Sequence, residues 1–541
     1  MDQAHEEFTA DQEKILNHYV SNISGNVFAL YNLSEVTKGA LFSRYSRSSL
    51  GLRSLLLKEF VDDDEIAMDE GRRVGEDDFS KDFIVATKKA MKLYDRILEG
   101  YGDDSIGELG GAHLAIEGIS MIAAKVIEDC RIGGSPLEKS TRYIYFDQKI
   151  HGEYMFYREP ILMTSAYRDT YVDTCNMLFE TYSELIPRLT AVMQERFPKD
   201  PQVSKAAYTP ALRAKVLDCL RGLLPASSLT NMGIYGNGRF YEGLIHKLEC
   251  HNLAEMQDTG CSVLEELSKV IPSFVRRGEL THKSHLSYAQ FHETMHEELK
   301  LVTAQCSKID ETETKSGVSL ISYDSDAVTK VAAALLYGNC DNGLKELEAY
   351  CRGTSEENIA RIFDAASNAR EDRRHKSPRA LERAEFTFEV VADFGAYRDL
   401  QRHRMLSQER QLLTCNCGYY VPAEIKGSDM EGLYCQALDS AKEVYDAIGG
   451  EFPEEAQYIV PMAYNIRWYF HANLRELQWL CELRSMPQGH PNYRYIAQKM
   501  AKDICDIFPA FETFFKFVNY EEHNFGRLGQ ERNIVAKKAK G

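Results

Sequence analysis

A chain of 541 residues is too long for one hydrophobic core and suits two domains of about 200–270 residues each. The formal net charge of −18 argues against duplex nucleic acid as a partner, because such binding depends on neutralising phosphates, although a nucleotide needs only a few arginines in one cleft. No run of about 18 apolar residues occurs and the first residues are acidic and polar, so we expect neither a membrane span nor a signal peptide.

The thirteen cysteines show no regular framework, which favours reduced thiols in a cytoplasmic protein over disulfides. Cys415 and Cys417 are the only tight pair in the sequence, and no second pair follows at zinc spacing. We therefore expect no metal site.

Strand and helix signals occur twice in the same order. Residues 8–22 predict a short amphipathic helix, residues 27–31 predict a strand, and Ser34 is a candidate N-cap for the helix that follows. In the second half, residues 318–323 predict the equivalent strand, followed by a helix capped at Asp324 or Asp326.

Apolar-periodic segments follow at 110–127 and 386–400, and the second of these alternates like a strand before it turns helical. Later helices are predicted at 239–248 and 464–484. Two further segments have a composition typical of solvated chain, with an acidic loop predicted at 61–80 and a disordered tail at 536–541.

The chain also repeats itself at the level of residues. Segment 31–38 reappears at 323–330 and Ser135 matches Ser407, while a third set of matches pairs Pro225, Asn237 and Arg239 with Pro461, Asn473 and Arg475. The order is preserved while the offset shrinks, which indicates a tandem duplication whose first copy carries more insertions. The domains predicted are an N-terminal extension at 1–25, a first domain at 26–275, a linker at 276–316, a second domain at 317–528 and a basic tail at 529–541.

The stretch from Ser135 to Tyr143 holds groups that suit a phosphate. Ser140 and Arg142 alternate and so would point the same way from an extended segment, which brings a hydroxyl, backbone amides and a guanidinium together. On the residues alone, a turn with a surface Arg–Glu pair is the better interpretation.

Three further positions carry clustered or terminal cations. Arg402, His403 and Arg404 are consecutive, and such clustering costs repulsion unless an anion is near, although a solvated basic helix end is the simpler interpretation. Arg484 and Arg221 each end a predicted helix, where a cation also suits the helix dipole.

Together these stretches resemble the flavin-dependent thymidylate synthases (ThyX), in which the pattern R-H-R-x7-S runs on as S-x-N-E-x-S-x-R-Y. Here the first half stands at 402–407 and the second at 135–143, with Leu137 in place of the asparagine. The resemblance implies an α+β fold, with two tandem ThyX-like α/β domains that each combine a small antiparallel sheet with long helices.

The resemblance also assigns roles. The implied substrate-binding residues are Glu138, Lys139, Ser140, Thr141, Arg142, Arg221, Arg402 and Arg484. The implied cofactor-binding residues are Arg402, His403, Arg404, Asn473, Arg475, Asn237, Arg239 and Glu138. The residues implied in catalysis are Arg484 and Arg402, with Ser140 positioning the substrate rather than attacking it.

Each copy has lost what the other keeps. The first copy has Cys130-Arg-Ile132 where the triplet belongs and Leu248 in place of Arg484, whereas the second has Gln457 in place of Arg221. In the family the two sets come from different subunits around one nucleotide. We therefore expect one composite site per chain, between the two domains of a chain or between chains, and a homodimer that mimics the family's tetramer.

The implied reaction is reductive methylation of dUMP to dTMP, with FAD as cofactor and methylenetetrahydrofolate and NADPH as co-substrates. The chain departs from the family at Asp103, Leu109 and Asp399, which touch flavin and folate contacts. Two alternatives stay open: a related flavoenzyme that modifies another pyrimidine nucleotide, and a catalytically silent nucleotide-binding protein.

Overall fold

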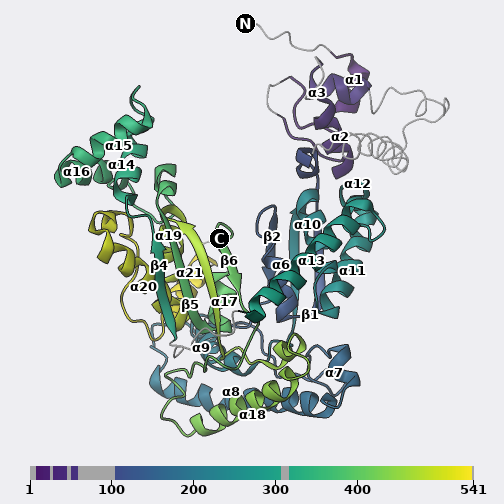
Figure 1. Cartoon of the computed structure of the whole chain (residues 1–541), viewed down its shortest axis with the longest axis vertical. Helices are drawn as coiled ribbons and strands as arrows, with labels where there is room; N and C mark the ends of the chain where they lie inside the picture. Colours follow the sequence, from purple (N-terminus) through teal and green to yellow (C-terminus); the bar gives the residue numbers. More distant parts are fainter. Residues whose placement is uncertain (1–7, 25–27, 46–49, 59–103, 306–315, 539–541) are drawn as a thin grey trace, which may run out of the picture. The chain divides into compact units, whose positions relative to one another are not determined.

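The computed structural model describes residues 8–24, 28–45, 50–58, 104–305 and 316–538 (Figure 1). These residues form two compact units, each assembled from separate stretches of chain. Unit 1 comprises residues 1–116, 130–137 and 232–309, and unit 2 comprises 117–129, 138–231 and 310–541. The units therefore do not coincide with the two sequence copies, because much of the first copy belongs to unit 2. The predicted domain boundaries follow the repeat and stay a prediction.

The first copy contributes a three-stranded sheet with strand order β1-β3-β2. The unit boundary crosses all three strands, which are β1 (Gly111–Ser120), β2 (Gly134–Glu138) and β3 (Leu229–Asn237). Strand β3 leads directly into helix α10 (Gly238–Glu249), whose first turn is capped where the Asn237 side chain accepts a hydrogen bond from the Phe240 amide.

Unit 1 buries the apolar face of α10 against further helices of the same unit. Phe240, Tyr241, Leu244, Ile245 and Leu248 recur at helical spacing and are all buried. The other described helices of unit 1 are α1 (Ala10–Leu16), α2 (Glu35–Tyr45), α3 (Leu52–Leu56), η3 (Asp104–Glu108), α11 (Ala254–Val270), α12 (Pro272–Val275), η5 (Arg276–Gly278) and α13 (Lys283–Gln305).

Unit 2 contains a four-stranded antiparallel sheet with strand order β4-β5-β7-β6. Its strands are β4 (Gly317–Tyr323), β5 (Glu385–Asp393), β6 (Ser407–Arg410) and β7 (Asn465–Asn473). In β7 the side chains of Ile466, Trp468, Phe470 and Ala472 are buried and alternate with more exposed ones, as the two-residue period of a strand requires.

In unit 2, strands β5 and β7 are each followed directly by a helix. Strand β5 runs into α17 (Phe394–Leu400), and β7 runs into α19 (Leu474–Arg484), each with a side-chain N-cap at the junction. The long helices α8 (Arg168–Arg196) and α18 (Glu431–Gly449) pack side by side (Figure 1). The other described helices of this unit are α6 (Met121–Glu128), α7 (Pro160–Thr164), α9 (Lys205–Leu220), η4 (Arg221–Leu223), α14 (Ala327–Tyr337), α15 (Leu344–Gly353), α16 (Glu356–Ser367), η6 (Arg379–Arg383), η7 (Glu455–Ile459), α20 (Pro491–Ile507), η8 (Pro509–Phe514) and α21 (Arg527–Lys538).

The predicted fold class is confirmed: two small antiparallel sheets are combined with long helices. Residues 110–127 and 386–400 each form a strand followed by a helix. The predicted cap at Ser34 is also present, since its Oγ accepts a hydrogen bond from the Thr37 amide at 3.0 Å.

Four local predictions need correction. Residues 464–484 are not one helix, because the first half is strand β7. Residues 28–31 do not form the predicted strand, because only Leu30 pairs, in an isolated bridge to Val20. The helix predicted at 8–22 is shorter and consists of α1 alone. Helix α21 extends through Lys538, so the first half of the predicted disordered tail is helical. The predicted acidic loop at 61–80 lies outside the described residues.

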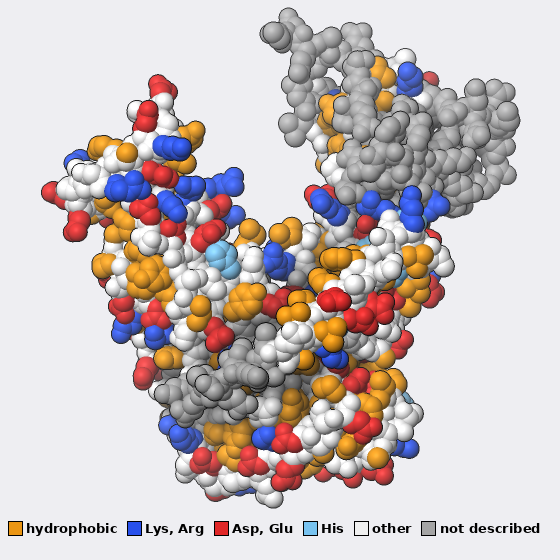
Figure 2. Space-filling view, in the orientation of Figure 1, with side chains coloured by type: hydrophobic (Ala, Val, Ile, Leu, Met, Phe, Trp, Pro, Cys, Tyr) orange, Lys and Arg blue, Asp and Glu red, His pale blue; other side chains and the backbone are white. Residues whose placement is uncertain are grey.

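The surface of the described residues mixes both signs of charge on the face drawn in Figure 2. Within the described ranges, no helix combines the length and the apolar character that crossing a membrane requires.

Candidate functional site

The end of β2 places a buried carboxylate among three cations of unit 2. Glu138 Oε2 lies 2.9 Å from Lys125 Nζ on α6 and 3.3 Å from Arg402 Nη2, and its Oε1 accepts a hydrogen bond from Arg398 on α17. Burial alone would raise the pKa of Glu138, but Arg398, Lys125 and Arg402 outweigh it and lower the pKa from 4.5 to about 2. The ionised carboxylate thereby ties a first-copy strand to two arginines of the second copy.

Arg142 follows in a turn rather than in the extended segment predicted from the sequence. The Ser140 hydroxyl accepts a hydrogen bond from the Arg142 amide, and the carbonyl of Ser140 accepts from the Tyr143 and Ile144 amides. This local bonding ends the strand at Glu138 and turns the Arg142 side chain toward second-copy residues.

All three nitrogens of the Arg142 guanidinium are engaged. Nε lies 2.8 Å from Asp218 Oδ1, Nη2 lies 2.8 Å from Asp399 Oδ2, and Nη1 donates to the Tyr493 hydroxyl at 3.2 Å. Tyr493 also lies beneath Arg484, whose Cζ is 5.8 Å from the ring centroid. One aromatic ring thus supports an arginine from each copy.

Asp399 lies at the centre of this cluster. Its carboxylate contacts Arg142 and lies 3.6 Å from Arg221 Nη2 and 3.9 Å from Arg484 Nη1. Burial opposes ionisation, but Arg142, Arg221, Arg484 and Arg402 hold the pKa of Asp399 far below its ordinary range. Asp399, one of the residues that depart from the family pattern, is therefore an internal counter-ion for the predicted substrate-binding arginines.

His403 is buried and orients Arg484. Its Nδ1 lies 2.8 Å from Glu476 Oε1, and its Nε2 accepts a hydrogen bond from Arg484 Nε at 3.0 Å. Burial lowers the pKa of His403, which favours the neutral ring with its proton on Nδ1. That tautomer leaves Nε2 free to accept, so the three side chains form one hydrogen-bonded chain.

The remaining predicted substrate residues lie around the same turn. Thr141 is buried, and Lys139 extends over the Phe146 ring, with Nζ 5.2 Å from the centroid. Arg221 begins η4 after α9 and is buried, and its Nη2 finds no hydrogen-bond acceptor among the described residues.

A cavity of unit 2, about 510 Å³ in volume, is lined by two of the predicted cofactor residues, Asn473 and Arg475. The Asn473 side chain caps α19, and Arg475 donates to the Ser377 carbonyl and to Glu382. The other residues lining this cavity are Arg370, Arg373, Arg374, His375, Lys376, Ser377, Glu382, Met405, Glu476, Gln478 and Trp479. Arg404, the last residue of the triplet, is exposed.

The equivalent first-copy pair belongs to unit 1 instead. Asn237 caps α10, and Arg239 forms an exposed ion pair with Glu108 at 2.9 Å. Their predicted role in cofactor binding stays a prediction.

Four residues of the cluster were missed by sequence reasoning: Lys125, Asp218, Arg398 and Tyr493. Lys125 looked like one polar residue in an apolar helix, and Asp218 and Tyr493 stand outside any motif. Only Arg398, four residues before the triplet, carried a signal, because a fourth arginine so close extends the basic cluster.

The arrangement as a whole suits an anion. Four arginines lie within electrostatic reach of Asp399, and the carboxylates of Asp218 and Asp399 neutralise them only in part. An anion bound here would gain charge-assisted hydrogen bonds in a largely buried setting, where they are strongest.

The fold and the cluster define a class: duplicated α+β proteins in which residues of both copies meet in one arginine-rich cluster. The model of a family described as "Thymidylate synthase complementing protein" matches residues 57–273 and, separately, residues 319–510. The chain belongs to this family and carries its domain twice, which confirms the resemblance and the tandem duplication.

Relatives match almost end to end. A UPF0159 protein from Chlamydia muridarum is 53% identical over 97% of this chain and 98% of its own length. A second UPF0159 protein, from Chlamydia pneumoniae, is 54% identical over the same shares. A third, from Thermoplasma acidophilum, is 32% identical over 93% of this chain and 99% of its own length.

Proposed function

We propose that the chain is a flavin-dependent thymidylate synthase that converts dUMP to dTMP, with FAD as cofactor and methylenetetrahydrofolate and NADPH as co-substrates. The observation that carries the proposal is the meeting of both half-motifs in unit 2. Arg142 and Arg221 of the first copy share one carboxylate, Asp399, with Arg484 of the second. The composite site would therefore lie within a single chain.

The arginines divide into two roles in this proposal. Arg142 and Arg221 would bind the nucleotide phosphate, for which a guanidinium fork is suited. Arg484, oriented by His403, would face the pyrimidine with Arg402 and favour its anionic form, which makes C5 the better carbon nucleophile. Because these charges are held in place before substrate arrives, they stabilise the developing charge without reorganisation.

The residues around Asn473 and Arg475 fit a flavin dinucleotide. The 510 Å³ cavity combines the cations Arg373, Arg374 and Lys376 with the indole of Trp479. Cations would bind the pyrophosphate and the aromatic face would pack against a ring. Bound and reduced, FAD would supply the hydride for the reaction.

A second candidate is a flavoenzyme acting on a different pyrimidine nucleotide. The observation that favours it is Asp399, an ionised carboxylate at a position where the chain departs from the family. A carboxylate accepts but cannot donate, so it would favour a substrate that presents a donor. Product analysis across dUMP, dCMP and UMP separates the two candidates.

The test uses full-length protein with added FAD. A visible flavin spectrum that shifts on adding dUMP, followed by thymidylate formation with folate and NADPH, is the expected result. Arg142→Ala and Arg402→Ala should each abolish dUMP binding, whereas Lys442→Ala, at an exposed ion pair on α18, should behave as wild type.

Two other results would contradict the proposal. A protein that retains no FAD but binds nucleotide would be the silent nucleotide-binding alternative. Tight dUMP binding by either arginine variant would contradict the composite site.

A further inference from the structure

The C-terminal segment of unit 2 brings one more arginine to the anion site. Phe525 stacks on Phe197, with ring centroids 5.1 Å apart, and meets Tyr208 of α9 edge-on at 6.1 Å. At Gly526 the backbone passes so close to the Pro487 carbonyl that an added Cβ would clash with its oxygen. These contacts fix the start of α21, and so fix Arg527.

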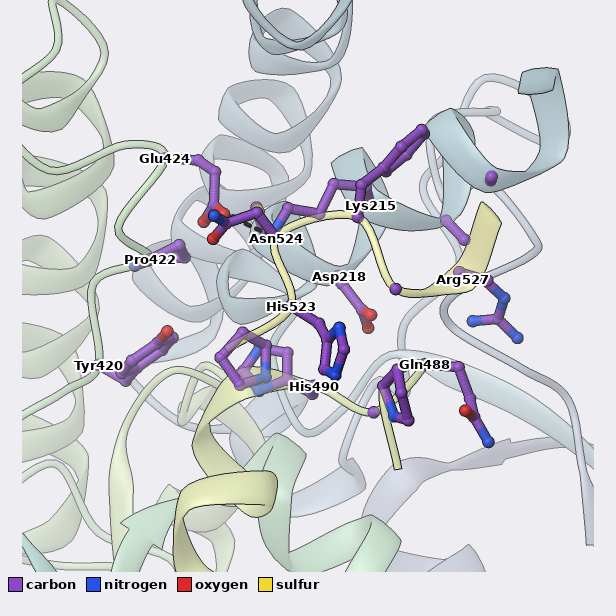
Figure 3. A pocket seen from close by; sticks show the side chains of 18 residues that line it. Lys215, Asp218, Tyr420, Pro422, Glu424, Gln488, His490, His523, Asn524 and Arg527 are labelled. Atoms are coloured by element: carbon purple, nitrogen blue, oxygen red, sulfur yellow. Dashed lines mark hydrogen bonds and ion pairs between the residues drawn. The ribbon is translucent and has the colours of Figure 1, made fainter. Parts of the chain in front are cut away.

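Arg527 lines a small cavity together with Asp218, a residue of the arginine cluster (Figure 3). The cavity has a volume of about 40 Å³, more than one water molecule requires. Asp218, which pairs with Arg142 and Arg221, forms part of its wall, as does His490. The cavity therefore adjoins the predicted phosphate-binding arginines.

Among the cations that line this cavity, Arg527 has guanidinium donors that make no hydrogen bond to the described residues. Lys215 is paired with Glu424, whereas Nε and Nη1 of Arg527 are buried and donate to no acceptor in the described part of the chain. The acid next to Arg527 is Glu531, one turn along α21, 3.9 Å from Nε. Burying guanidinium donors without acceptors costs free energy that a bound anion would recover.

The guanidinium of Arg527 lies close to the turn that holds Arg142. Its Cζ lies 4.3 Å from the ring centroid of Tyr143, the residue that follows Arg142. Burial first, and then the like charge of Arg142, lower the pKa of Arg527 to about 10. Two neighbouring cations in a buried setting repel, and an anion between them would remove that repulsion.

We propose that Arg527 is a further substrate-binding residue, which donates to the phosphate of the nucleotide from a segment outside the matched family regions. The matched regions end at residue 510, so this donor would be an addition to the family's domain. The inference rests on the proposed nucleotide site and names the chemistry of its ligand there, a phosphate monoester.

The experiment measures dissociation constants of the full-length protein by calorimetry for dUMP, for deoxyuridine, which lacks the phosphate, and for inorganic phosphate. Arg527→Gln should weaken dUMP and inorganic phosphate by about tenfold, the loss expected for a charge-assisted hydrogen bond, and leave deoxyuridine unchanged. Arg527→Lys should retain part of the affinity, because the charge remains. Arg532→Gln, exposed on the same helix, is the matched control.

Equal dUMP affinity in wild type and Arg527→Gln would overturn the inference while leaving the proposed nucleotide site intact. If wild type binds inorganic phosphate but not dUMP, and Arg527→Gln weakens the phosphate, the phosphate-binding role of Arg527 stands, whereas dUMP as its ligand and the proposed function both fall. Should Arg527→Gln fail to fold, amide exchange of the wild-type segment 523–531 decides the matter. Protection by dUMP and by phosphate, but not by deoxyuridine, is expected, and no protection by any of them refutes the proposal.

Discussion

At the scale of single residues, the central feature is a carboxylate where an anionic ligand is expected. Asp399 accepts a hydrogen bond from Arg142 and neutralises part of the charge on Arg221 and Arg484. A buried acid with such partners stabilises the empty site, because unpaired buried cations are costly. The same carboxylate competes with a phosphate for the Arg142 donors.

Asp399→Asn should therefore make the empty protein less stable and more responsive to ligand. Removing one partner of a buried ion network costs about 3–5 kcal/mol, so we expect a clear fall in melting temperature without ligand. Added dUMP should raise the melting temperature of the variant by more than that of wild type, since the ligand replaces the lost charge.

Differential scanning calorimetry with and without dUMP measures both effects. Asp446→Asn, at the exposed pair with Lys442, controls for loss of any acid. An Asp399→Asn protein as stable as wild type, or one that gains nothing extra from dUMP, would show that Asp399 is no counter-ion for the ligand site.

At the scale of elements, unit 1 contains a buried histidine pair that joins two helices. His246 Nδ1 of α10 lies 3.0 Å from His285 Nδ1 of α13, and both side chains are largely buried. Burial first, then His285, Arg277 and His282, lower the pKa of His246 from 6.5 to about 4. The packing of α13 on α10 therefore depends on a neutral pair.

This pair predicts a pH dependence with a definite sign. Between pH 6.5 and about 4 the unfolded state binds more protons at His246 than the folded state, so stability falls as the pH falls through that window. Above pH 6.5 the contribution is fully present. Amide protection of α13, corrected for intrinsic exchange, should decrease by up to about tenfold between about pH 7.5 and about pH 5, allowing for partial exposure.

The variant His246→Asn should remove most of this dependence, whereas His296→Asn, at an exposed position of α13, should leave it unchanged. A wild-type protein whose α13 protection is the same at both pH values would contradict the assignment.

The elements also show where residue patterns predict structure and where they mislead. Strand β5 and helix α17 were predictable because alternation in 386–390 gives way to a helical period. Segment 464–473 was misassigned because it is as apolar as the helix that follows it. This segment is a strand because β5 and β6 pair with its two edges. In that pairing, its two-residue period places the apolar side chains on one face of the sheet.

At the scale of the whole molecule, the positions at which one copy has lost a site arginine are occupied by buried, uncharged side chains. Gln457, which stands where the first copy has Arg221, is buried and accepts a hydrogen bond from the Leu413 amide at 3.1 Å. Leu248, which stands where the second copy has Arg484, is fully buried in α10. Neither position offers a charge to a ligand.

We therefore expect one nucleotide per chain. Calorimetric titration of full-length protein with dUMP should give a stoichiometry near one, because only one combination of half-motifs retains its arginines. Titration of Arg142→Ala should show no residual site of similar affinity. Two equivalent nucleotides per chain would contradict the account of the duplicated copies. The predicted homodimer is checked separately, by light scattering.

Residue patterns alone were enough to recognise the duplication, the complementary loss of half-motifs and the α+β class, because motifs and periodicities are local in sequence. They could not show that Asp399 lies among Arg142, Arg221 and Arg484, or that His403 orients Arg484. They gave no sign of Tyr493 or Arg527 beside the cluster. Those facts depend on packing, which brings residues 142, 218, 399 and 493 together from separate elements and sets their charges through burial.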